Sequence, residues 1–303
     1  MTTGPRVAPA AAPPTVDALA ATFGLDTDGA EVVRAATRHV VRFPASAVRT
    51  FAVPGGTTGP RQEAAVASLL ADAGVPATRR LAGPALIDGW WVTAWREIPG
   101  VDPAAPPVDA ATLGALAARL HHATGGIDRR GVVACDPLGA ALGQLEVAIP
   151  VGATSDDELA VVRRAVTRLE PVWQAAVDRA VADGGAVLHG DLHAGNVVIG
   201  AHGPVLVDLE LAGWGPPAYD AAPTVAFLRW YDSPAGEAAV FDEAYGAPLT
   251  AAARDGALEE VWALWSACWC VANRHRSPEL EEEAKVRLAT VETGQTPVPW
   301  QLR

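Results

Sequence analysis

The feature that most restricts the fold of this chain is a pair of runs, VLHGDLHAGNVVIG at 187–200 and VLVDLE at 205–210. The end of the first run and the start of the second are short apolar segments of β-forming residues. The four residues 200–203, which begin and end with glycine, favour a turn between them, so the sequence predicts a β-hairpin. Asn196 and Asp208 then meet at its open end, with backbones about 5 Å apart.

Three side chains around this hairpin suit one kind of chemistry. Asn196 and Asp208 offer two oxygen ligands, which suit a magnesium ion that carries nucleotide phosphates. Asp191 lies in a loop five residues before Asn196, where its carboxylate could accept the proton of an attacking hydroxyl. The spacing therefore predicts a base and a metal site that face one reaction centre.

The segment HGDLHAGN resembles the catalytic loop of the aminoglycoside phosphotransferase and choline kinase family, which is similar in fold to protein kinases. The resemblance implies an α+β, two-lobed, protein-kinase-like fold with a small N-terminal antiparallel sheet lobe and a larger, mainly helical C-terminal lobe. It also implies transfer of a γ-phosphate from ATP or GTP, with Mg²⁺, to a hydroxyl of a small molecule.

The same resemblance assigns roles to individual residues. Asp191 is the catalytic base, and His189 orients the loop from behind it. Asp208-Leu209-Glu210 stands where protein kinases have Asp-Phe-Gly, so Glu210 replaces the glycine and is expected on the substrate side. Asp220 is expected to brace the catalytic loop.

An alternative interpretation is a metallohydrolase, because His189, Asp191 and His193 alternate like metal ligands on one face of a strand. Gly190 and Gly195 argue against a regular strand there, and the other histidines form no second cluster.

Composition excludes several classes of partner. The net charge of −12 argues against nucleic-acid and anionic-membrane binding, since both need clustered Lys and Arg. Three cysteines without a C-x-x-C pair suggest a reduced, cytoplasmic protein. A monomer or homodimer is expected. Residues 1–14 lack the apolar core of a signal peptide and are expected to be a disordered tail.

The region 15–98 is expected to be the nucleotide-binding N-lobe. An apolar strand over 86–95, interrupted by Asp88-Gly89, closes this lobe. Its other expected elements are strands at 31–35, 38–43 and 47–53 and a helix at 61–73.

The region 99–303 is expected to be the C-lobe, with the catalytic loop and acceptor-binding helices. Asp109 can cap one helix, and Ser155 with Glu158 forms a capping box for a long helix in which Pro171 predicts a kink or break. Three or four further helical segments are expected between 220 and 292.

The nucleotide side lacks the usual lysine, since the chain has only Lys285, far downstream. We expect Arg49 to bind phosphates instead, with Glu63 as its ion-pair partner, and Arg42 is the alternative. The adenine is expected near the backbone of three residues that end the lobe, Trp95, Arg96 and Glu97.

The acceptor side is expected to be acidic, because residues 208–303 contain 15 acidic and 7 basic residues. Glu259 and Glu260 are pocket candidates, and Trp262 and Trp265 lie on one stripe of a helix that Trp230 could extend. These features favour an aminoglycoside-like antibiotic or another amino-bearing natural product, and hence antibiotic resistance. The alternatives are a metabolic sugar or amino-alcohol kinase and, in another class, a non-catalytic kinase-like binding module.

Overall fold

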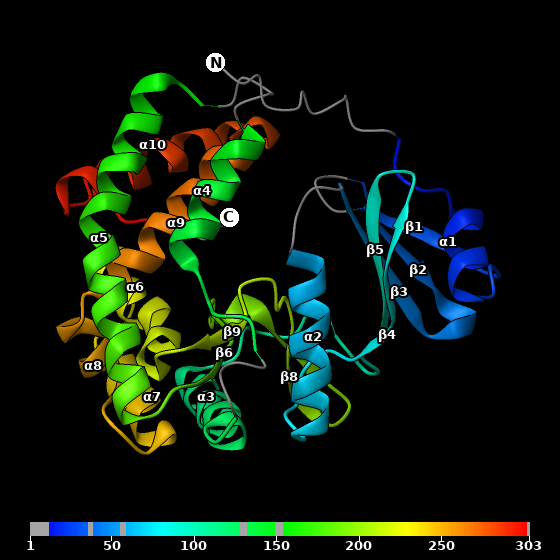
Figure 1. The fold of residues 1–303 in the computed structure, drawn as a ribbon, viewed down its shortest axis with the longest axis horizontal. Coiled ribbons are helices and arrows are strands. Elements are labelled where there is room, and N and C mark those ends of the chain that lie inside the picture. Colours follow the sequence, from blue (N-terminus) through cyan, green and yellow to red (C-terminus); the bar gives the residue numbers. More distant parts are fainter. Residues whose placement is uncertain are drawn as a thin grey trace. The chain divides into compact units, whose positions relative to one another are not determined.

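The protein is described from a computed structural model that covers residues 12–35, 39–54, 59–102, 104–127, 132–148 and 154–301 (Figure 1). Most of the expected disordered tail, residues 1–11, lies outside the described residues. The chain separates into two compact units, residues 1–105 with 199–210, and residues 106–198 with 211–303. The lobe boundary expected at 98/99 thus differs from the unit boundary, and the segment 199–210 belongs to the first unit.

The first unit is built on a five-stranded antiparallel sheet with the order β1-β2-β3-β5-β4, which confirms the expected α+β class. The same unit contains helices α1 and α2. The bounds are α1 Val16–Phe23, β1 Glu31–Ala35, β2 His39–Phe43, β3 Val48–Pro54, α2 Gly59–Asp72, β4 Arg80–Ile87 and β5 Trp90–Arg96.

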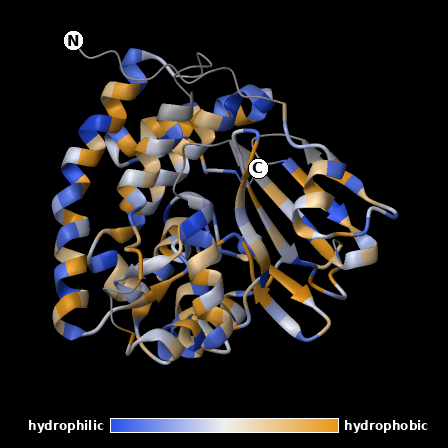
Figure 2. Ribbon diagram, turned by 45° about the vertical axis from the view of Figure 1, so that its right-hand side comes forward, coloured by the Kyte–Doolittle hydropathy of each residue, from blue (hydrophilic) through white to orange (hydrophobic). Residues whose placement is uncertain are grey.

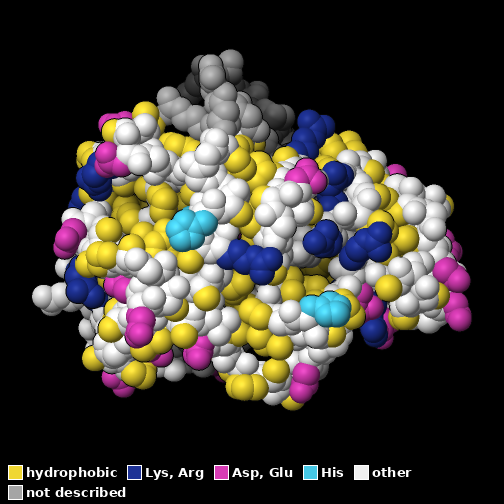
Figure 3. Space-filling model, turned by 90° about the horizontal axis from the view of Figure 1, so that it is seen from below, with side chains coloured by type: hydrophobic (Ala, Val, Ile, Leu, Met, Phe, Trp, Pro, Cys, Tyr) yellow, Lys and Arg dark blue, Asp and Glu magenta, His cyan; other side chains and the backbone are white. Residues whose placement is uncertain are grey.

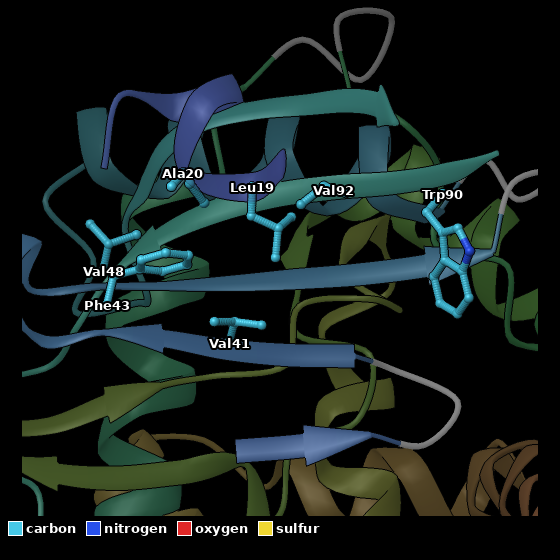
Figure 4. Packing of buried hydrophobic residues seen from close by; sticks show 8 residues of the cluster. Leu19, Ala20, Val41, Phe43, Val48, Trp90 and Val92 are labelled. Carbon is cyan, nitrogen blue, oxygen red and sulfur yellow. The ribbon is translucent and has the colours of Figure 1, made fainter. Parts of the chain in front are cut away.

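Helix α1 was not expected from the sequence, and it completes the core of the first unit. Thr15 caps its first turn by accepting a hydrogen bond from the backbone N–H of Ala18. Leu19 then packs with Phe43 and Val92 among the buried side chains of the sheet (Figure 4). Burial of these side chains is what stabilises so short a helix.

The strand expected over 86–95 is in fact the meeting point of two strands. Asp88 and Gly89 both have positive φ angles, 48° and 83°, and form the tight turn of the β4–β5 hairpin. Two left-handed residues in succession are typical of the two-residue turn that Asp-Gly favours. The interruption in the apolar run was therefore a hairpin signal.

The β-hairpin of the motif is present, with a shorter turn than expected. Strands β7 (Val197–Gly200) and β8 (Gly203–Leu206) pair, so the turn contains only residues 201–202. Within the first unit, Leu206 exchanges backbone hydrogen bonds with Pro76 and Thr78, which anchors β8.

The second unit is mainly helical, with one small sheet that carries the catalytic loop. Between residues 220 and 292 it has five α-helices where three or four were expected. Its elements are α3 Ala110–Thr124, α4 Pro137–Ala148, α5 Asp156–Asp183, β6 Ala186–Leu188, β9 Gly213–Gly215, α6 Ala222–Trp230, α7 Glu237–Tyr245, α8 Leu249–Asp255, α9 Leu258–Asn273 and α10 Pro278–Thr293.

The expected helix starts are confirmed. Asp109 caps α3, and Ser155 and Glu158 form the capping box of α5. The expected break at Pro171 is wrong, because Pro171 lies inside α5, which is one continuous helix of 28 residues. Hydrophilic and hydrophobic residues alternate along α5 (Figure 2), and packing of its apolar side against α9 and α10 offsets the cost of the proline.

Candidate active site

The catalytic loop starts where β6 ends, and its backbone is fixed by a glycine. Gly190 has a φ of 82°, and a Cβ atom there would come within 2.5 Å of the carbonyl oxygen of Leu211. Only glycine fits this conformation and this close approach. The path of the chain therefore requires glycine at the position before Asp191.

Asp220 lies against this loop, as the resemblance implies. Its carboxylate is fully buried and accepts hydrogen bonds from the backbone N–H groups of His189, at 2.9 Å, and Gly190, at 2.8 Å. Nε2 of His121 lies 2.9 Å from the same carboxylate, and Nδ1 of His121 lies 3.1 Å from the hydroxyl of Tyr245. Sequence reasoning missed His121, because no local pattern links the end of α3 to a loop far along the chain.

His189 lies behind Asp191. The imidazole is fully buried, and its Nδ1 accepts a hydrogen bond of 3.3 Å from the backbone N–H of Asp191. The side chain thus holds the backbone of the loop at the position of the expected base.

Asp191 is held by partners on both of its carboxylate oxygens. The indole N–H of Trp262 donates to Oδ1 at 2.7 Å, and the amide of Asn196 donates to Oδ2 at 3.0 Å. Burial raises the pKa of Asp191, but His193, with Nε2 3.5 Å from Oδ2, and the Trp262 N–H outweigh burial, so the pKa is lowered overall. At neutral pH the side chain is a carboxylate and can accept a proton.

Asn196 is oriented with its nitrogen toward Asp191, because Nδ2 also donates to the backbone carbonyl of Asp191 at 2.9 Å. The amide oxygen is therefore turned away from this contact and is the end that suits a cation. In the first unit, Asp208 has a φ of 61°, in the left-handed region that non-glycine residues rarely adopt outside functional sites and turns.

No group of three or more His, Cys, Asp or Glu residues that could hold a metal ion occurs in the described part of the chain. The metallohydrolase interpretation therefore has no structural support. An amide oxygen and a carboxylate are each groups that suit a hard cation, and the expected metal roles of Asn196 and Asp208 stay a prediction.

The expected phosphate-binding arginines are neighbours in the sheet of the first unit. Arg42 on β2 is the register partner of Arg49 on β3, and one oxygen of Glu97 contacts both, at 2.7 and 3.1 Å. Burial raises the pKa of Glu97, but its hydrogen bonds to the two arginines outweigh this and lower it. The structure thus places Glu97 on Arg49. Glu63 lies half-buried on α2, and its expected pairing with Arg49 stays a prediction.

The three residues expected around the adenine are largely used by the fold itself. Trp95 is buried, and the backbone N–H groups of Arg96 and Glu97 donate to the carbonyl oxygens of Arg79 and Ala47. Those two donors are thus already bonded, and the expected contact of this backbone with the adenine stays a prediction.

The tryptophans that the sequence placed on the acceptor side are packed in the helical core of the second unit. Trp230, Trp262 and Trp265 are only 4%, 3% and 6% exposed, so none presents a ring face to a ligand. Aromatic rings that are half-buried stand beside them instead. Phe227 lies 6.0 Å from His193 and 5.7 Å from Trp262 between ring centroids, and Tyr231 lies 4.5 Å from Phe227.

The expected acidic residues are paired with arginines. Glu259 contacts Arg229 at 2.9 Å, and Glu260 contacts both Arg229 and Arg168. Acidic side chains are scattered over the face of the molecule in Figure 3. Glu210 lies half-buried in the first unit, and its expected contact with the acceptor stays a proposal.

Comparison with known protein families identifies the family of this chain. The model of the phosphotransferase enzyme family matches residues 27–269, which is most of the chain. The chain belongs to this family. It is therefore a small-molecule phosphotransferase with a hydroxyl acceptor, as the catalytic loop predicted. No curated protein sequence matches it.

Solved structures support the family's kinase-like fold. Amicoumacin kinase hAmiN in complex with AMP-PNP, Ca²⁺ and Ami is 13% identical with a TM-score of 0.63, covering 91% of this chain and 92% of that one. A choline/ethanolamine kinase family protein from Mesorhizobium loti is 21% identical with a TM-score of 0.56, covering 88% of each chain. Aminoglycoside phosphotransferase APH(3'')-Id from Streptomyces rimosus is 17% identical with a TM-score of 0.57, covering 83% and 96%.

At these identities the likeness is one of fold. The two-lobed α+β phosphotransferase fold expected from the sequence is confirmed, while the acceptor differs among the neighbours by their names. None of the helices in the described ranges is long and apolar enough to span a membrane.

Proposed function

We propose that this phosphotransferase transfers the γ-phosphate of ATP or GTP, with Mg²⁺, to a hydroxyl of a small molecule, and that Asp191 is the catalytic base. The observation that carries the proposal is the state of the Asp191 side chain. It is buried, its pKa is lowered, and both of its oxygens are held in a loop braced by Asp220.

Asp191 can both orient and activate the acceptor. Each carboxylate oxygen has two lone-pair directions, and the hydrogen bonds from Trp262 and Asn196 use one on each. One of the two remaining directions can accept the hydrogen bond of the acceptor hydroxyl and then its proton. In this reaction class, positioning of the hydroxyl supplies more of the rate than the proton transfer does.

The proposed metal ligands are the amide oxygen of Asn196 and the carboxylate of Asp208. Held by these two residues, Mg²⁺ would neutralise the charge that develops on the transferred phosphate. Asn196 directly precedes β7 and Asp208 lies two positions after β8, so both belong to the hairpin motif. The amicoumacin kinase structure contains a divalent cation with AMP-PNP, which supports a nucleotide-borne metal.

We propose Arg42 and Arg49 together as the phosphate-binding pair. The two guanidinium groups share Glu97, which orients both while leaving other N–H donors on each. The sequence left open which of the two arginines binds the phosphates, and we propose that both do.

The acceptor is proposed to carry an amino group, as in an aminoglycoside-like antibiotic, and the enzyme to be a cytoplasmic one that confers resistance. The excess of acidic residues after 208 supports an amine, because it raises the local concentration of cations. The buried state of all three cysteines as free thiols supports a reducing compartment.

A second candidate is an amino-alcohol kinase. The half-buried rings of Phe227 and Tyr231, close to partners of Asp191, favour it, since aromatic rings attract a cationic head group without a carboxylate. Pairing of Glu259 and Glu260 with arginines favours the same candidate.

The test is ADP or GDP release measured with Mg²⁺ over a panel of acceptors, namely kanamycin, amicoumacin, choline, ethanolamine and aminopropanol. We expect release that depends on one acceptor class and that Asp191→Asn lowers at least about 1,000-fold, as removal of a catalytic unit does. Asp178→Asn, on the exposed side of α5, is the matched control. An Asp191→Asn protein that folds and keeps its turnover would overturn the proposal.

A further inference from the structure

One short hydrogen bond to the Asp191 side chain comes from outside the catalytic loop. Nε1 of Trp262 on α9 lies 2.7 Å from Oδ1, and the two residues are separated by 71 positions in the sequence. Trp262 is 3% and Asp191 7% exposed, so the hydrogen bond is shielded from water. A charge-assisted hydrogen bond in such surroundings is stronger than one in water.

We propose that Trp262 is a positioning residue for the catalytic carboxylate. The inference rests on the proposed role of Asp191 as base. Rotation about the last torsion of an aspartate is broad and roughly two-fold, so a single hydrogen bond leaves the plane of the carboxylate loosely fixed. Asn196 holds Oδ2 and Trp262 holds Oδ1, and two anchors on opposite oxygens fix that plane.

The indole itself is held firmly. Its ring and that of Phe227 form an edge-to-face pair with 5.7 Å between centroids, and Phe227 in turn contacts His193, a second neighbour of Asp191. Helix α9 packs against α4, α5, α6 and α10, and nearly every residue from Leu258 to Asn273 is buried. The anchor therefore lies on a buried and densely packed helix, while the loop it holds has no regular backbone structure at Asp191.

The chain offers a matched control one turn along the same helix. Trp265 is 6% exposed, and its indole N–H has no hydrogen-bond partner in the described part of the chain. Replacing either tryptophan with phenylalanine removes similar volume from the same core. Only Trp262→Phe also removes a hydrogen bond to Asp191.

The test compares Trp262→Phe with Trp265→Phe in steady-state kinetics with ATP, Mg²⁺ and the panel acceptor that the wild-type enzyme uses fastest. We expect kcat to fall about 10- to 100-fold in Trp262→Phe, with the KM for ATP within about twofold of wild type. Trp265→Phe should keep kcat within about threefold of the wild-type value, and this range allows for altered packing. A tryptophan analogue with sulfur in place of the N–H, introduced at position 262, keeps the shape and should reproduce the fall in kcat.

A spectroscopic readout makes the result independent of turnover. The indole ¹H–¹⁵N signal that disappears in Trp262→Phe should shift in Asp191→Asn, whereas the Trp265 signal should not. Equal kcat values for the two phenylalanine variants, or full activity of the analogue, would overturn the positioning role and leave the proposed function standing. A wild-type enzyme inactive on every acceptor would overturn the proposed function, while the indole signal would still report whether the hydrogen bond exists.

Discussion

Nε2 of His121 lies 2.9 Å from Oδ2 of Asp220, although 99 positions separate the two residues. The same carboxylate receives the backbone N–H groups of His189 and Gly190, so it joins the end of α3 to the catalytic loop. Asp220 therefore fixes the backbone that carries Asp191, without itself facing a substrate.

Asp220→Ala should strongly destabilise the second unit. The change leaves two buried backbone N–H groups and an imidazole without their acceptor, and we expect the free energy of unfolding to fall by about 3–5 kcal/mol. Urea unfolding followed by circular dichroism measures this. Tyr245→Phe, which removes only the hydroxyl 3.1 Å from His121, should cost about 1 kcal/mol. A similar small value for Asp220→Ala would mean that the carboxylate does not carry the loop.

What the sequence revealed about this site was local. Asp191 and Asn196 could be recognised because the hairpin and its glycines are short-range patterns, and the caps at Asp109 and Ser155 depend on neighbours within one turn. The direction of the Asn196 amide and the left-handed backbone of Asp208 lie beyond such patterns, because tertiary contacts determine them.

The parts that sequence reasoning missed depend on long-range contacts or on misread signals. Strand β4 contains Gly83 and Pro84, which weaken a strand pattern. The sequence therefore did not reveal β4 or its pairing with β5. The tryptophan stripe on α9 was compatible with a wall or with core, and periodicity alone cannot distinguish the two. The partner of Trp262 could not be found, since no spacing rule relates α9 to the loop.

Asp208 should tolerate asparagine better than alanine in stability while losing function with both. Its φ of 61° suits Asp and Asn, whereas alanine there costs roughly 1 kcal/mol more. We expect both variants to lose phosphotransfer, because neither supplies the proposed anionic ligand, and only Asp208→Ala to unfold at a lower urea concentration. Acceptor-dependent ADP release and urea midpoints are the measurements. Substantial turnover in Asp208→Asn would argue against the metal role.

Glu97→Gln should alter the acid side of the stability profile. The folded-state pKa of Glu97 is lowered, because its hydrogen bonds to Arg42 and Arg49 outweigh burial. Such a group stabilises the protein above its unfolded pKa of about 4.3, and the stabilisation is lost as the pH falls through the folded pKa. The difference between wild type and Glu97→Gln in urea midpoint should therefore be largest above about pH 5 and shrink toward pH 3.

The same variant should raise the KM for ATP if the two arginines bind phosphates, because they lose their common anchor. Glu31→Gln is the control, since Glu31 is exposed and contacts Arg42 at 3.4 Å. Equal KM values for the two variants would separate Glu97 from nucleotide binding.

Two adjacent carboxylates on α9, those of Glu259 and Glu260, should respond differently when their charge is removed. Burial raises the pKa of Glu259 despite Arg229, and Oε2 of Glu259 has no hydrogen-bond partner among the described residues. Burial also acts on Glu260, but Arg168 and Arg229 outweigh it and lower the pKa. A raised folded pKa means that the ionised form is disfavoured by folding, and a lowered one means the reverse.

At pH 7, Glu259→Gln should leave the free energy of unfolding unchanged or raise it by up to about 1 kcal/mol, because the buried charge is removed while an oxygen remains for Arg229. Glu260→Gln should lower it by about 0.5–1 kcal/mol, the range of partly exposed ion pairs.

The stability that Glu259 contributes is complete below its unfolded pKa and is lost as the pH rises through its folded pKa. That of Glu260 is present at neutral pH and is lost on acidification. The two variants should therefore converge as urea unfolding is repeated from pH 7 to about pH 4. A Glu259→Gln variant that is much less stable than wild type at pH 7 would show that its ion pair with Arg229 outweighs the cost of burial.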